Sequence, residues 1–182
     1  EYDKSFGTGF NFRPDSRWDL EFDIFIRNEF DTDQYIEQIY DDQASNTYGS
    51  RYIFSDISND SKGMTFEASM IYSPKLSLQF FFSPELGHYQ YEGLKEFKSP
   101  RKFDFIYYDE DQITKIDDET IEVYPGDADP FILSRDYIRG FNFLSLRSNF
   151  IIKWEFKTGS SMFLVWQNER NHFEVTDDNG LK

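Results

Sequence analysis

Side chains that could take part in hydrolysis lie close together at one place in the sequence, where Ser83 and Glu85 precede His88. A nucleophile and a base within hydrogen-bond reach are the minimum for nucleophilic catalysis. A hydrolase that uses His88 is therefore one hypothesis, and an ordinary loop histidine is the simpler one. The chain has no cysteine and only one other histidine. Thiolate sites and multi-histidine metal sites are thus excluded, and we expect no enzymatic activity.

Carboxylates are concentrated between Asp104 and Asp129, where ten acidic residues accompany one lysine. Within this stretch, Asp127 and Asp129 are weak candidates for Ca²⁺ ligands, because Ca²⁺ prefers carboxylate oxygens. Their spacing does not match a calcium loop of the Asp-x-Asp-x-Asp-Gly type. We therefore expect a solvated acidic loop, no bound metal and no cofactor.

The charge balance limits the partners of the protein. The 182 residues include 34 acidic and 19 basic ones, which gives a formal net charge of −15. Binding to nucleic acid requires a cationic surface, so the composition argues against it. No run of about 18 apolar residues occurs, so no transmembrane helix is expected.

A period of two dominates the sequence and predicts β-strands. From Trp18 to Ile26 the even positions are apolar and the odd positions are mostly charged. Similar alternation and very short turns predict three hairpins, at about 4–29, 64–83 and 142–170. Within 161–170 apolar residues occupy both parities, so the register there stays open.

The segments between the hairpins are polar, and we expect long loops at about 30–62 and 84–141 within a single domain, 1–182. The stretch from Phe30 to Asn46 is ambiguous. Its apolar residues have helix-like spacing, but an extension of the strands is equally compatible with it.

Two architectures explain the alternation. One is a soluble surface β-sandwich that binds carbohydrate or protein, with its apolar faces packed inward. The other is an antiparallel up-and-down transmembrane β-barrel, with apolar side chains toward lipid, short periplasmic turns and long extracellular loops. The thirteen alternating residues from Leu144 to Phe156 favour the barrel, because soluble strands average about 5–6 residues.

Aromatic residues near the short turns also favour the barrel, because such rings gather at membrane interfaces. The predicted interface aromatics are Phe12, Trp18, Tyr72, Trp154 and Phe156. The predicted lumen-facing charges are Asp19, Glu21, Asp23, Arg27, Arg147, Lys153 and Glu155. These charges could tune the solute preference of a pore, or they could form a cross-strand lattice of salt bridges.

Several stretches carry a family resemblance. They are Phe12–Pro14, Arg51–Phe54, Leu76–Phe80, Tyr89–Glu96, Ser99–Arg101, Asn142–Asn149, Lys153–Phe156 and Gly159–Gln167. These stretches resemble the C-terminal barrel domain of an uncharacterised family of Bacteroidota outer-membrane proteins. In that family the barrel follows a periplasmic module similar to family 9 carbohydrate-binding modules. The resemblance implies a barrel fold in the bacterial outer membrane and brings no catalytic residues with it.

The expected function follows from the barrel interpretation. We expect part of the strand set of an outer-membrane barrel that contacts lipid. It would pass or capture a nutrient, glycan-derived or otherwise, or belong to a complex with other envelope proteins. The glycan expectation rests on the companion module and on loop aromatics that could stack on sugars. These aromatics are Tyr89, Tyr91, Tyr107, Tyr108 and Tyr124.

Overall fold

The computed structural model describes residues 1–126 and 128–176, and these residues form an all-β protein, as the alternation predicts. The strands are β1 (Tyr2–Phe12), β2 (Trp18–Tyr40), β3 (Ser50–Ser73), β4 (Leu76–Phe97), β5 (Phe105–Tyr108), β6 (Ile113–Lys115), β7 (Thr120–Val123), β8 (Phe131–Ser134), β9 (Gly140–Lys157) and β10 (Ser160–Thr176). Short 3₁₀ helices lie at Ser45–Thr47, Glu110–Gln112 and Arg135–Tyr137.

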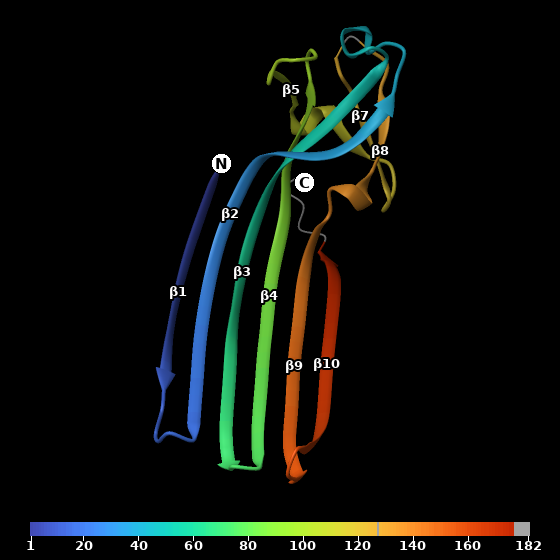
Figure 1. Ribbon diagram of the computed structural model, residues 1–182. Coiled ribbons are helices and arrows are strands. Elements are labelled where there is room, and N and C mark those ends of the chain that lie inside the picture. Colours follow the sequence, from blue (N-terminus) through green and yellow to red (C-terminus); the bar gives the residue numbers. More distant parts are fainter. Residues whose placement is uncertain (127, 177–182) are drawn as a thin grey trace.

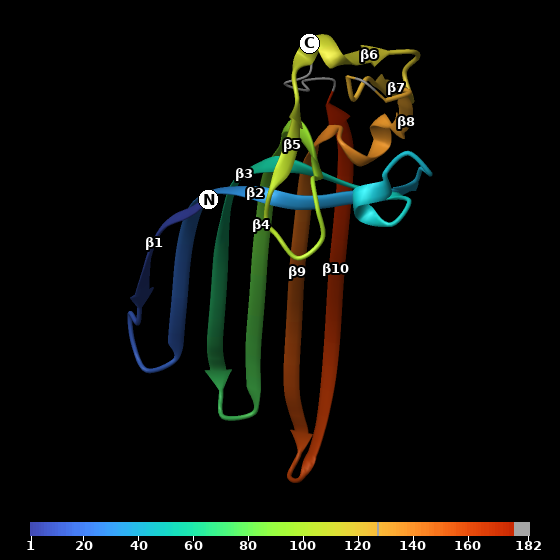
Figure 2. The ribbon, with the colours of Figure 1, turned by 90° about the horizontal axis from the view of Figure 1, so that it is seen from above.

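Six long strands form one antiparallel layer in the order β1-β2-β3-β4-β9-β10. Figures 1 and 2 show these strands side by side, with the three short turns at one end and the small strands β5 to β8 at the other. We call these ends the turn end and the upper end. Within the described residues β1 and β10 are both edge strands, so this sheet is open.

The three predicted hairpins are present, but their strands are longer than expected. They correspond to β1–β2, β3–β4 and β9–β10. The second hairpin turns at Pro74 and Lys75, and the third turns through Gly159 at φ +78°, a backbone conformation that favours glycine.

The prediction of a long loop at 30–62 is wrong for most of its length. Strand pairing between β2 and β3 continues from Phe30 opposite Ser58 to Tyr40 opposite Ser50. Irregularities between Asp31 and Gln34, and again after Tyr35, shift the register. A bulge of this kind interrupts the period of two, which explains why the sequence pattern does not reveal the strand. The helix that the spacing of apolar residues after Phe30 suggested does not form before Tyr40, because β2 continues to that residue.

The predicted loop at 84–141 also contains strands. β4 continues to Phe97, and β6, β7 and β8 form a separate three-stranded sheet. The acidic stretch is therefore not a simple solvated loop. Within it, Ile121 and Val123 are buried while Glu122 between them is only partly covered. The alternation was hidden because the strands are only three or four residues long.

The hydrophobic core lies at the upper end and not in the long sheet. We call this part the upper domain: the ends of β2, β3 and β4 together with residues 98–139. Its buried cluster consists of Ile53, Leu94, Tyr108, Ile121, Val123, Phe131, Leu133 and Ile138. Burial of apolar surface there stabilises the packing of the small sheet on the extended strands.

Candidate functional site

The long sheet has two chemically different faces. Opposite residues in an antiparallel pair point to the same side, and here even-numbered residues face even-numbered ones across the regular part of all six strands. We call the two sides the even face and the odd face. The register of the last hairpin, open from the sequence, places Met162, Leu164 and Trp166 on the even face.

The even face carries a continuous apolar band. One row across it runs from Phe10 through Phe22, Phe66, Phe82 and Ser148, and the next includes Phe80, Phe150 and Trp166. Polar residues interrupt the band at Thr8, Ser148, Asn168 and Arg170. None of its apolar side chains is buried, and Phe6 remains 67 % exposed. No second layer formed by the described residues covers this face (Figures 1 and 2).

The five predicted interface aromatics are spread along the turn end, at even-numbered positions of β1, β2, β3 and β9. Trp18 lies opposite Met70, and Trp154 lies opposite Leu76. The rings of Trp154 and Phe156 meet edge to face with centroids 6.1 Å apart. All five are partly or largely exposed; they are Phe12, Trp18, Tyr72, Trp154 and Phe156.

The seven predicted lumen-facing charges all lie on the odd face: Asp19, Glu21, Asp23, Arg27, Arg147, Lys153 and Glu155. They do not form an extensive lattice. Within residues 1–126 and 128–176, ion pairs on this face join Arg13 to Asp19 at 2.8 Å and Arg27 to Asp3 at 2.8 Å.

Acidic side chains dominate the odd face of β2, and β3 adds Glu67. Glu21 lies directly opposite Glu67, and like charges in that position repel. Water around both carboxylates would reduce this repulsion, because a high dielectric constant weakens Coulomb interactions. The pair therefore indicates a hydrated surface.

The odd face is also hollowed. One shallow hollow of about 200 Å³ includes Glu67, Gln79 and Asn149 in its lining, and another of about 250 Å³ includes Ser77 and Lys153. Small side chains on this face, such as that of Ser77, leave these two hollows unfilled. The apolar residues on this face are Phe25, Ile71, Phe81, Ile151, Phe163 and Val165, and, toward the upper end, Ile57, Tyr89, Tyr91, Phe141, Phe143, Phe173 and Val175.

His88 does not meet the partners that hydrolysis would require. It lies on the even face, where its Nδ1 is 2.7 Å from Oδ1 of Asn142. Ser83 and Glu85 are odd-numbered neighbours on the same regular strand and point to the opposite side. Ser83 is instead buried beside Thr65, with the two hydroxyl oxygens 3.4 Å apart. The structure thus does not bring these three residues together.

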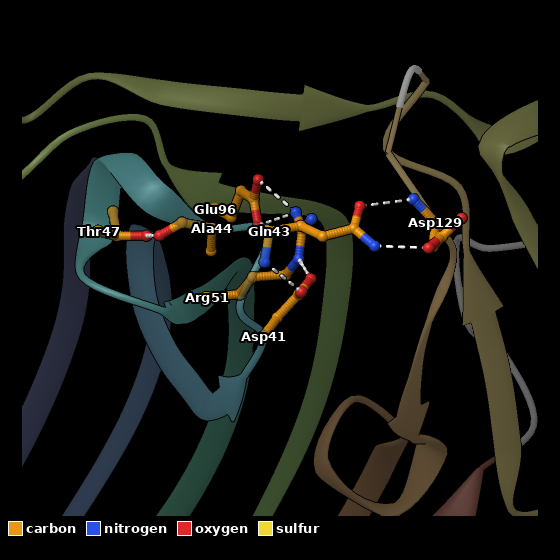
Figure 3. A network of polar contacts seen from close by, with 7 residues as sticks. All are labelled: Asp41, Gln43, Ala44, Thr47, Arg51, Glu96 and Asp129. Atoms are coloured by element: carbon orange, nitrogen blue, oxygen red, sulfur yellow. Dashed lines mark hydrogen bonds and ion pairs between the residues drawn. The ribbon is translucent and has the colours of Figure 1, made fainter.

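The weak calcium candidates are only partly described, because Asp127 lies outside the described residues. The Asp129 carboxylate accepts a hydrogen bond of 2.5 Å from the Gln43 side chain, whose oxygen accepts one from the Asp129 backbone N–H at 3.0 Å (Figure 3). Among the described residues, no group of three or more acidic or histidine side chains could hold a metal ion. Asp129 therefore joins the upper domain to the loop before β3.

A buried ion-pair network, absent from the sequence predictions, lies beside this contact (Figure 3). Arg51 donates from Nε to Asp41 at 2.6 Å and from Nη1 to both oxygens of Glu96 at 2.9 Å. The hydrogen bond from Arg51, followed by one from the Gln43 backbone, lowers the pKa of Asp41. Burial, followed by the Glu96 charge, raises the pKa of the nearby Tyr108 hydroxyl.

A second buried cation, Lys95, holds the bend between the long sheet and the upper domain. Its Nζ lies 2.7 Å from Asp56 and 3.5 Å from Asp33, and 5.0 Å from the centre of the Phe105 ring. Sequence reasoning missed Arg51, Lys95 and Glu96, because their partners lie on other strands and no local pattern connects them.

The loop aromatics that could stack on sugars are divided by the fold. Tyr108 is buried in the core and Tyr91 packs against it. Tyr89 stacks on Phe141 with centroids 4.6 Å apart, while Tyr107 and Tyr124 are exposed. They do not form one common platform.

Comparisons with family models, with curated proteins and with solved structures find no match to this chain. Among the described residues, no helix is long and apolar enough to cross a membrane.

Proposed function

We propose that the chain forms part of the wall of an outer-membrane β-barrel, with the even face toward lipid and the odd face toward an aqueous lumen. The observation that carries this proposal is the uncovered apolar band on the even face. An exposed apolar surface that spans six strands needs an apolar partner, and lipid would supply it.

The length of the band supports lipid as that partner. From Leu76 to Leu86 the strand advances ten residues, or about 33 Å at about 3.3 Å per residue. With the tilt of about 40° usual for barrels, this corresponds to about 25 Å, the height of the apolar band of outer-membrane barrels. The aromatics at the turn end would then lie at the periplasmic interface, and the upper domain would lie outside the cell.

The odd face supports an aqueous path for a polar solute. Its opposed carboxylates, Glu21 and Glu67, and its hollows suit hydration and not contact with an apolar substrate. Passage or capture of a polar nutrient is therefore the role that we propose, with no catalytic step. The family resemblance remains part of this proposal, and so does an association with other envelope proteins through the free strand edges.

Membrane fractionation of the full-length protein, followed by a heat-modifiability gel in detergent, tests this proposal. We expect the protein in the outer-membrane fraction, with a band that changes mobility on boiling because a closed barrel resists detergent. A protein that is soluble without detergent and shows no shift would contradict it. The β-sandwich would then be favoured, with a second layer over the even face.

A further inference from the structure

A groove with mixed chemistry lies on the even face where the apolar band ends. It has a volume of about 570 Å³ and its lining comes from β2, β3, β4, β9 and β10. Most of the lining side chains belong to two neighbouring rows of the sheet. The inner row is Ile26, Lys62, Leu86, Leu144 and His172. The outer row, nearer the upper domain, is Asn28, Asp60, His88, Asn142 and Glu174.

The charges in this groove follow an order along the strands. On β3, the ammonium of Lys62 is in the inner row and the carboxylate of Asp60 is in the outer one. On β10, His172 and Glu174 repeat this arrangement of a basic residue inside and an acidic residue outside. Among the described residues, Lys62 takes part in no ion pair, and Asp60 accepts a hydrogen bond from the Asn28 side chain through Oδ1, which leaves its other oxygen to accept from a ligand.

The middle of the groove is apolar on its inner side and polar on its outer side. Leu86 and Leu144 lie opposite each other on β4 and β9 and are 45 % and 42 % exposed. Beyond them, His88 and Asn142 are paired through their side chains. An amphiphile could therefore lay its chain on the leucines and its polar head on the outer row.

We infer that this groove binds the head of a phospholipid that carries both a phosphate and a primary amine. The inference rests on the proposed function, since it requires the even face to contact lipid. In such a lipid the phosphate follows the acyl chains and the amine is outermost. The order of Leu86, Lys62 and then Asp60 on the neighbouring strands β4 and β3 matches that sequence of groups, and charge-assisted hydrogen bonds would hold the phosphate on Lys62 and the amine on Asp60.

The same order discriminates against other lipids. An anionic lipid without an amine would bring its negative charge near the Asp60 carboxylate without donating a hydrogen bond to it. A quaternary ammonium head has no N–H to donate to Asp60. Phosphatidylethanolamine should thus bind more tightly than phosphatidylglycerol or phosphatidylcholine.

Native mass spectrometry of the detergent-solubilised, delipidated full-length protein tests the inference with these three lipids. We expect phosphatidylethanolamine to bind about tenfold more tightly than the others, and Lys62→Gln or Asp60→Asn to remove about that factor. Lys153→Gln, on the odd face, is the control and should bind as the unaltered protein does. Equal affinity for the three lipids, or no loss in either groove variant, would overturn the inference.

The heat-modifiability gel, run on the same preparations, separates failure of the groove from failure of the barrel. A heat-shifted protein without lipid preference overturns the groove and leaves the proposed function standing. A soluble protein without a heat shift overturns both. A groove variant that loses the lipid but keeps the shift is folded, and that result supports the inference.

Discussion

Arg51 and Glu96 form a buried ion pair in which Nη1 of the arginine lies 2.9 Å from each carboxylate oxygen. The side chains are 5 % and 8 % exposed, and Arg51 also binds Asp41. The pair joins β3 to β4 just beyond the long sheet. Both residues belong to the upper domain, so the pair stabilises the part of the protein that has a hydrophobic core.

Removal of one member of this pair should destabilise the upper domain. We expect Arg51→Ala to lower its free energy of unfolding by about 3–5 kcal/mol, because Glu96 would remain buried without its partner. Denaturant unfolding followed by far-ultraviolet circular dichroism measures this change in the free energy of unfolding. The matched control is Arg13→Ala, whose exposed pair with Asp19 should matter little. Equal effects of the two variants would contradict this prediction.

The same network predicts sensitivity to acid. The pKa of Asp41 is lowered in the folded protein, so its contribution to stability is present above its ordinary pKa of about 3.9. That contribution is lost as the pH falls below this value toward the folded-state pKa. Urea unfolding at pH 7, 5 and 3 should show this loss between pH 5 and 3. Asp41→Asn should reduce the pH dependence, and an unchanged profile in that variant would count against the assignment.

Adjacent residues of β8 test where the core lies. Leu133 is 1 % exposed within the buried cluster, whereas its neighbour Ile132 is 60 % exposed. We expect Leu133→Ala to cost about 2–5 kcal/mol because it leaves a cavity. Ile132→Ala should change stability by less than about 0.5 kcal/mol. Thermal unfolding of the two variants measures the difference, and similar losses would show that the small sheet packs differently.

The sequence predicted the part of the fold in which side-chain alternation is regular. Trp18 to Ile26 and Leu144 to Phe156 have one apolar and one polar face, and both pair as expected. The extension of β2 to Tyr40 was one of two alternatives that the sequence left open, because bulges after Asp31 and Tyr35 interrupt the alternation. Strand pairing there depends on backbone hydrogen bonds, which leave no mark on side-chain hydropathy.

The candidate sites were predictable to different degrees. The parity of Trp154 and Glu155 assigned them to opposite faces correctly, since parity is a local property. The Arg51 network and the groove on the even face depend on which strands are neighbours. Lys62 and His172 are separated by two intervening strands, and only the order β3-β4-β9-β10 places them in one row.

The opposed carboxylates of the odd face predict cation preference in a pore. In planar bilayers with a salt gradient, Glu21→Gln in the full-length protein should move the reversal potential toward that of an unselective pore. The reason is the loss of one of two facing negative charges, Glu21 and Glu67. Glu122→Gln, in the small sheet, is the control and should leave selectivity unchanged. A reversal potential unaffected by the first variant would contradict a lumen position for this pair.

The most direct test of the account is the accessibility of neighbouring residues on β4, which is simple to measure because the chain has no cysteine. Single cysteines are placed at Leu78 and Phe80 on the even face, and at Ser77 and Gln79 on the odd face. In lipid vesicles that contain the full-length protein, a water-soluble maleimide should label positions 77 and 79 and spare 78 and 80. Detergent-denatured protein should label at all four positions. Equal labelling of the two faces in vesicles, or labelling of the even face alone, would contradict a lipid-facing even face.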